Sequence, residues 1–313
     1  MALPSAMVLP LLIVFAAGIY YIYNEVMHYM AKSLVRNKVV VITDAVSGVG
    51  NECAHLFHKG GARLILCGAN WDKLESLYDS LTNDADPSET FAPKLVILDF
   101  SDMESMEDVM AEVVDCYGCV DVLILNSSMK VKAPVQSVSL ELDRNIMDIN
   151  YFGPTTLTKG ILPTMIPRRS GQFILVNSIQ GRLAIPFRSS YAASKHAVQA
   201  FFDSLRAEVE EYGITVSTVS HTFIDANVTP SSEKPDSKAN SLTTFVASHL
   251  THGVHPTVLA NEIMRTVNRK RKEVVLAHPI PRVAVYLRAV LPSFLFAVLG
   301  AGVKDSILAE QMQ

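Results

Sequence analysis

The stretch VVVITDAVSGVGNECAHLFHKGGARLILC, residues 39–67, decides the fold. It joins an apolar β-branched run to a helical pattern and then to a second apolar run, with Gly48 and Gly50 at the first junction. Glycine has no side chain to block a phosphate that approaches the N–H groups at a helix N-terminus. One glycine-rich turn is a weak signal, because many α/β turns use glycine structurally. Asp44, which follows Thr43, can also cap this turn through its carboxylate.

The alternation of strand and helix patterns continues along the chain. The predicted strands are seven short apolar runs, at residues 38–43, 63–67, 94–99, 120–126, 171–177, 215–220 and 273–277. They are apolar throughout rather than alternating, as expected for parallel strands covered on both faces. The sequence therefore predicts an α/β fold with a doubly wound, Rossmann-like sheet of seven strands, whose carboxyl ends bind ligands.

Composition divides the 313 residues into three predicted parts. Residues 1–36 are a signal anchor with its linker, residues 37–280 a dinucleotide-binding domain, and residues 281–313 an apolar extension. The net charge of -4 argues against a nucleic-acid partner. Cys116 and Cys119 form a C-x-x-C pair without a second pair at matching spacing, so no metal site is predicted.

The anchor is predicted from MVLPLLIVFAAGIYYIY, residues 7–23, which carry no charge. Roughly 17 residues make about the shortest helix that spans a hydrocarbon core. The cations that follow, Lys32, Arg36 and Lys38, predict that the rest of the chain faces the cytosol. We therefore expect contact with membrane lipid through this segment; its cleavage and secretion of the protein is the alternative.

Two later segments are predicted to lie outside the main alternation. Residues 289–303 are apolar but short and contain Pro292, which favours an interfacial segment or a flap over an apolar pocket rather than a membrane span. Residues 229–241, rich in Ser, Pro and Lys, are a predicted loop. In this fold such a loop is well placed to cover a substrate.

A second motif lies in SSYAASKHAVQAFF, residues 189–202. Tyr191 and Lys195 are four residues apart and so share one face at the start of a predicted helix. A nearby ammonium lowers the pKa of a phenol, which makes tyrosine a usable acid or base, although this spacing is common by chance. Ser178 lies at the carboxyl end of a predicted strand, the edge where ligands bind.

Together these residues resemble the short-chain dehydrogenase/reductase family over roughly residues 37–277. The family's T-G-x-x-x-G-x-G turn matches Thr43, Gly48 and Gly50, with Asp44 in place of the first glycine. The family's catalytic tetrad matches the four residues Asn150, Ser178, Tyr191 and Lys195.

The resemblance also implies a role for each member of this tetrad. Tyr191 would be the acid/base, and Lys195 would lower its pKa and hold the nicotinamide ribose. Ser178 would hold the substrate oxygen, and Asn150 would fix a water for the proton relay. The cofactor contacts that follow are Thr43, Ser47, Gly48, Val49, Gly50, Asp99, Asn126, Tyr191, Lys195 and Thr222.

Several positions depart from the family pattern, all on the cofactor side. The N-N-A-G turn reads Leu125-Asn126-Ser127-Ser128, and the proline-glycine pair after the sixth strand reads His221-Thr222. The end of the second strand, residues 67–70, has no cation for the 2′-phosphate of NADP, which favours NAD. An extra carboxylate at Asp44 weakens phosphate binding by like-charge repulsion without abolishing it.

The resemblance implies an oxidoreductase of the endoplasmic or sarcoplasmic reticulum membrane. It would transfer a hydride between NAD and an apolar alcohol or carbonyl such as all-trans-retinol/retinal or a steroid. The alternative is a catalytically weak or inactive dinucleotide-binding regulatory protein of the same membrane. The altered cofactor positions favour that alternative, whereas the intact tetrad favours the enzyme. A homo-oligomer is left open.

Overall fold

The computed structural model describes residues 18, 21, 34–83, 85–86, 88–224 and 253–311, with side chains up to residue 301. Almost all of the anchor predicted at residues 7–23, and the whole loop predicted at residues 229–241, lie outside these ranges. Within these ranges, no helix combines the length and apolar character needed to cross a membrane.

A sheet of seven parallel strands forms the centre of the fold, in the order β3-β2-β1-β4-β5-β6-β9. The predicted Rossmann-like sheet is therefore confirmed, and each strand end lies within two residues of its predicted position. The strands are β1 (Val39–Ile42), β2 (Arg63–Gly68), β3 (Lys94–Ile97), β4 (Val122–Leu125), β5 (Gly171–Ser178), β6 (Ile214–His221) and β9 (Glu273–Leu276). A separate parallel pair joins β7 (Phe223–Ile224) to β8 (Gly253–Val254).

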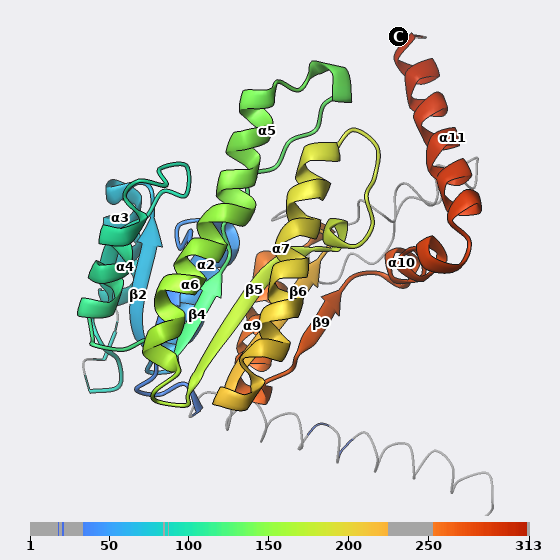
Figure 1. The fold of residues 1–313 in the computed structure, drawn as a ribbon. Helices are drawn as coiled ribbons and strands as arrows, with labels where there is room; N and C mark the ends of the chain where they lie inside the picture. Colours follow the sequence, from blue (N-terminus) through green and yellow to red (C-terminus); the bar gives the residue numbers. More distant parts are fainter. Residues whose placement is uncertain are drawn as a thin grey trace, which may run out of the picture.

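Helices cover both faces of this sheet (Figure 1). One face packs in an apolar core against α2 (Gly48–Lys59), α3 (Trp71–Thr82) and α9 (Pro256–Arg269). The opposite face packs in a second core against α4 (Met106–Asp115), α6 (Gly153–Met165) and α7 (Ser189–Glu208). Because both faces are covered, the five inner strands are almost entirely buried and read as apolar runs in the sequence, whereas the edge strands β3 and β9 are partly exposed.

The remaining helices lie toward the carboxyl ends of the strands, where the arrowheads point in Figure 1. α5 (Leu140–Met147) continues through a π-helical stretch, Asp148–Phe152, into α6. The chain ends in α10 (Pro279–Val290) and α11 (Pro292–Gln311), which stand beside the α/β layers.

The strand order reverses between β1 and β4, because β2 and β3 lie on one side of β1 while all later strands of the sheet lie on the other. The loops that leave two such neighbouring strands turn toward opposite faces. Ligands bind in the crevice that this reversal opens.

Candidate active site

The turn after β1 is closed by a hydrogen-bond network around Ser47. Its hydroxyl donates to the Asp44 carbonyl oxygen at 2.8 Å and accepts from the Gly50 N–H at 3.2 Å. Asn126, which follows β4, donates from Nδ2 to the same hydroxyl at 2.8 Å. Ser47 is therefore the N-cap of α2, a role for which serine is well suited.

Thr43 links the same two strand ends. Its Oγ1 accepts the Asn126 N–H at 3.0 Å and the Ser127 hydroxyl at 3.2 Å. Thr43 is fully buried and does not line a cavity. Its hydrogen bonds hold the turn after β1 against the loop after β4. Asn126 is the asparagine that the chain keeps from the family turn, and its backbone and side-chain hydrogen bonds join the two loops.

The two glycines of the turn differ in how much space surrounds them. A Cβ on Gly50 would lie 2.2 Å from the Asp44 carbonyl oxygen, so this position requires glycine. A Cβ on Gly48 would meet Pro256 at 3.5 Å, which is an ordinary contact. The protein itself therefore tolerates a side chain at Gly48, and the space beside it belongs to a cavity.

Asp44 has a backbone φ of 48°, the left-handed region that glycine adopts most easily and aspartate tolerates. This conformation explains why the family places glycine here and how aspartate replaces it. Ser47 is the N-cap of α2, while the closing of the turn by the Asp44 carboxylate stays a prediction. Burial raises the pKa of Asp44 to about 6, although Ser47, Lys73 and Lys130 act against this shift.

The tetrad residues come from three elements. Ser178 ends β5, Tyr191 and Lys195 lie in the first two turns of α7, and Asn150 lies in the π-helical stretch. All four are buried, none more than 3 % exposed. The Lys195 Nζ lies 5.9 Å from the centre of the Tyr191 ring.

Asn150 supports the loop after β4. Its Oδ1 accepts the Met129 N–H at 2.7 Å, while its Nδ2 donates to the Met129 carbonyl at 2.9 Å and to the Ser194 hydroxyl at 3.0 Å. Both amide protons are therefore used inside the protein. The Asn150 side chain can take part in a proton relay only as an additional acceptor.

Burial dominates the electrostatics of the catalytic pair. It raises the pKa of Tyr191, and the hydroxyls of Ser178 and Ser128 and the charge of Arg188 act in the opposite direction. Burial, helped by Lys130, lowers the pKa of Lys195 to about 7. The expectation that Lys195 lowers the phenol pKa is therefore wrong for the protein by itself. Burial is the largest influence on the pKa of Tyr191, and the groups that oppose it are Ser178, Ser128 and Arg188.

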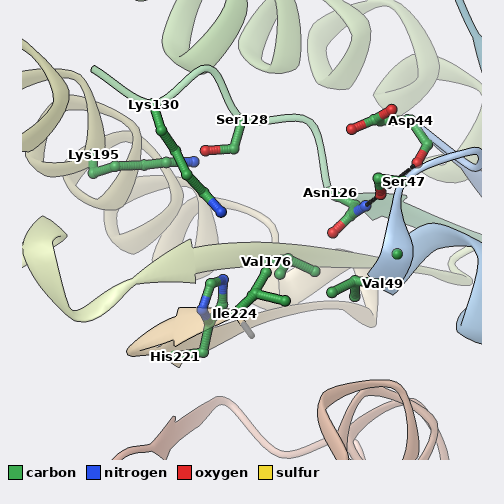
Figure 2. A pocket seen from close by; sticks show the side chains of 11 residues that line it. Asp44, Ser47, Val49, Asn126, Ser128, Lys130, Val176, Lys195, His221 and Ile224 are labelled. Atoms are coloured by element: carbon green, nitrogen blue, oxygen red, sulfur yellow. Dashed lines mark hydrogen bonds between the residues drawn. The ribbon is translucent and has the colours of Figure 1, made fainter. Parts of the chain in front are cut away.

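A first cavity, of about 190 Å³, connects the turn with the catalytic helix. We call it the phosphate cavity. Figure 2 shows Asp44, Ser47 and Asn126 at one end and Lys130, Lys195 and His221 at the other. Gly48 and Val49 expose the N-terminus of α2 to it, where backbone N–H groups lack helical partners. An anionic pyrophosphate fits this combination of helix N-terminus and cations.

A second cavity, of about 230 Å³, opens between the ends of β2 and β3. We call it the adenosine cavity. Its apolar walls include Leu98, Phe100 and Ile149, and its charged lining residues are the two carboxylates Asp44 and Asp99. An uncharged purine nucleoside fits these walls. A 2′-phosphate would face two carboxylates there.

The structure brings together most, but not all, of the predicted contacts. Ser47, Gly48, Val49, Asn126 and Lys195 line the phosphate cavity, and Asp99 lines the adenosine cavity. Three predicted residues line neither cavity and instead support the loops around them through the contacts given above: Thr43, Gly50 and Asn150. Thr222 is buried and lines neither cavity.

Three residues of the site are absent from the predicted contacts, although His221 is one of the altered cofactor-side positions. Lys130 reaches into the phosphate cavity from the β4 loop (Figure 2). His221 also lines it, beside Ser178 in the sheet, and burial lowers its pKa to about 3, so it is neutral. Arg188 immediately precedes α7, and its positive charge acts to lower the pKa of Tyr191. A lysine two residues beyond an altered family turn is the one signal that points to Lys130.

Comparison with known proteins agrees with this fold and site. The family model described as short chain dehydrogenase matches residues 38–237. The chain therefore belongs to the short-chain dehydrogenase/reductase family, whose fold binds a nicotinamide dinucleotide.

Among relatives, the chain is 67% identical to dehydrogenase/reductase SDR family member 7C-A of Danio rerio, with all of both chains covered. It is 57% identical to dehydrogenase/reductase SDR family member 7C of Homo sapiens, with 98% of each covered.

Solved structures share the fold at low identity. A short-chain dehydrogenase from Streptomyces avermitilis matches with a TM-score of 0.66 at 23% identity, covering 88% of this chain and 98% of that one. A metagenomic short-chain oxidoreductase in complex with NADP matches with a TM-score of 0.62 at 20% identity, covering 78% and 98%.

Proposed function

We propose that this protein is an NAD-dependent dehydrogenase/reductase that interconverts an apolar alcohol, such as all-trans-retinol or a steroid, and its carbonyl. The observation that carries the proposal is the buried Tyr191 hydroxyl, with Ser178 beside it and Lys195 one helical turn away. The lysine opens onto the phosphate cavity, so the acid/base group adjoins the cofactor site.

The chain's own residues divide the work of the reaction. When bound, the nicotinamide exchanges a hydride with the substrate carbon. Tyr191 gives a proton to the substrate oxygen in reduction and takes it back in oxidation. Ser178 orients that oxygen. Burial raises the pKa of Tyr191 and so favours the protonated phenol, the form that gives a proton to the substrate oxygen in reduction.

The choice of NAD is supported by the charges of the two cavities. The cations Lys130 and Lys195 line the phosphate cavity, while the adenosine cavity is lined by Asp44 and Asp99. At the end of β2, Gly68 and Ala69 offer no cation. A 2′-phosphate would lack a partner and would meet carboxylates.

The apolar substrate is supported by the loop between Ser178 and Tyr191. Leu183 and Ile185 of this loop pack with apolar residues of α10 and α11. The chain segment between the two catalytic residues therefore carries apolar side chains that pack against the C-terminal helices. We further propose attachment to the reticulum membrane by residues 7–23, with the catalytic domain on the cytosolic side, on the strength of that segment's uncharged sequence and the cations after it.

The test is turnover by the membrane-bound protein with NAD and NADP against retinoids and steroids, with Tyr191→Phe as the matched variant. The ring stays while the proton donor goes, so kcat should fall by about 10²–10⁴-fold with NAD affinity nearly unchanged. Equal turnover by Tyr191→Phe would contradict the assignment. NAD binding without turnover by either protein would favour a regulatory dinucleotide-binding protein.

A further inference from the structure

The two C-terminal helices expose an unusually apolar surface. Up to residue 301, three of their side chains are buried, those of Pro281, Ala284 and Leu295. Ala284 and Leu295 pack in one cluster with Leu183 of the body. Large apolar side chains at least half exposed are Val283, Tyr286, Val290, Leu291, Phe294 and Phe296. We call these six residues the C-terminal patch.

Such a patch indicates a partner. Soluble monomers seldom expose apolar side chains contiguously, and larger exposed patches mark protein or membrane contacts. α11 is apolar on nearly all sides through residue 301 rather than on one stripe, which is typical of a helix that is buried in something.

The charges around the patch select the kind of partner. No acidic residue occurs between residues 274 and 304, while Arg282, Arg288 and Lys304 do. Arg288 is exposed on α10 beside the patch. Cations that flank exposed Tyr and Phe side chains match a bilayer interface, where aromatic rings lie at headgroup level and cations meet anionic lipid.

From these observations we propose that α10 and α11 lie on a lipid bilayer, with the C-terminal patch inserted below the headgroups. This contact is separate from the N-terminal segment and does not depend on the catalytic proposal. Val283 and Tyr286 on α10 and Phe294 on α11 would enter the interface, about 5–10 Å deep at most.

The placement has a consequence for the site. Leu183 lies in the loop that joins Ser178 to Tyr191, and its side chain packs directly on Ala284 and Leu295. A bilayer at the patch therefore lies next to the loop that carries the catalytic residues. An apolar ligand dissolved in the membrane could reach this loop without crossing water.

Tryptophan fluorescence tests the contact, because the chain contains a single tryptophan, Trp71. Full-length Trp71→Phe protein carrying Phe294→Trp is reconstituted in vesicles of phosphatidylcholine and phosphatidylserine with brominated acyl chains. Phe294 is 56% exposed, so the larger ring fits without repacking. Tyr286→Trp in the same background is the second reporter, and the parent protein with Trp71 on α3 is the control.

We expect brominated lipid to quench both reporters several-fold more than Trp71. Arg288→Gln should reduce the quenching most in vesicles rich in phosphatidylserine. Reporters quenched no more than Trp71 would overturn the proposal. A blue-shifted emission that brominated lipid does not quench would also overturn it, and would show that a second protein surface covers the patch.

Discussion

The two cavities at the carboxyl edge of the sheet differ in charge although they share Asp44. The phosphate cavity holds the ammonium groups of Lys130 and Lys195 and the N-terminus of α2. The adenosine cavity is lined by apolar side chains and the carboxylates Asp44 and Asp99. This division matches NAD, whose charge lies on the pyrophosphate and whose adenosine carries none.

The backbone of Asp44 explains how an aspartate can occupy a position where the family has glycine. Asp44 keeps the left-handed backbone that the turn needs, and burial keeps its carboxyl partly protonated near pH 6. At neutral pH most of this group is ionised, so Asp44 places a negative charge between the two cavities. The turn therefore keeps the backbone geometry of the family's cofactor turn.

Removing a cation from the phosphate cavity should have the largest effect on the difference in charge between the two cavities. Lys130→Met should weaken NAD binding by about 10–100-fold, since a charge-assisted contact contributes about 1.5–3 kcal/mol. Lys132→Met, two residues away and exposed, is the control and should leave affinity unchanged. Calorimetric titration of both variants decides, and equal affinities would remove Lys130 from the site.

Substitutions at the two glycines of the turn should affect stability and NAD binding differently. Gly50→Ala forces a Cβ to 2.2 Å from the Asp44 carbonyl and should destabilise the domain by about 1–3 kcal/mol. Gly48→Ala meets only an ordinary contact and should keep its melting temperature while weakening NAD binding. Thermal unfolding with and without NAD measures both. Similar melting temperatures for the two variants would contradict the geometry of the turn.

Adding a cation to the adenosine cavity should reduce the difference in charge between the two cavities. Ala69→Arg supplies a partner for the 2′-phosphate and should shift the NADP/NAD preference by roughly ten-fold toward NADP. Ser76→Arg, exposed on α3, carries the same charge away from the cavity and is the control. If the ratio of the two dissociation constants stayed at the parental value, the adenosine cavity would be wrongly assigned.

The smallest expected effect is on pH dependence. Lys195, with a pKa of about 7, loses its charge as pH rises, and Asp44, with a pKa of about 6, gains one. Both changes oppose an anionic cofactor, so NAD affinity should fall between pH 5.5 and 8 by several-fold. Asp44→Asn should remove the lower step alone. An affinity that rises with pH would show that neither group faces the pyrophosphate.

The strand pattern was predictable because buried parallel strands leave continuous apolar runs, as in Val39–Ile42. The positions of Ser178 and Tyr191 followed from strand and helix ends. Lys130 did not, since sequence does not show where a loop side chain points. The raised pKa of Tyr191 is not predictable from helical spacing, because spacing shows which side chains are neighbours but not how deeply they are buried.

The most direct test of a working NAD site is titration of the full-length protein with NADH, followed by energy transfer from Trp71. This tryptophan begins α3, just beyond the Gly68 and Ala69 wall of the adenosine cavity. We expect saturable transfer with NADH, much weaker transfer with NADPH, and a lower affinity for NADH in Lys130→Met. Absence of saturable transfer with NADH, or tighter binding of NADPH, would contradict this expectation.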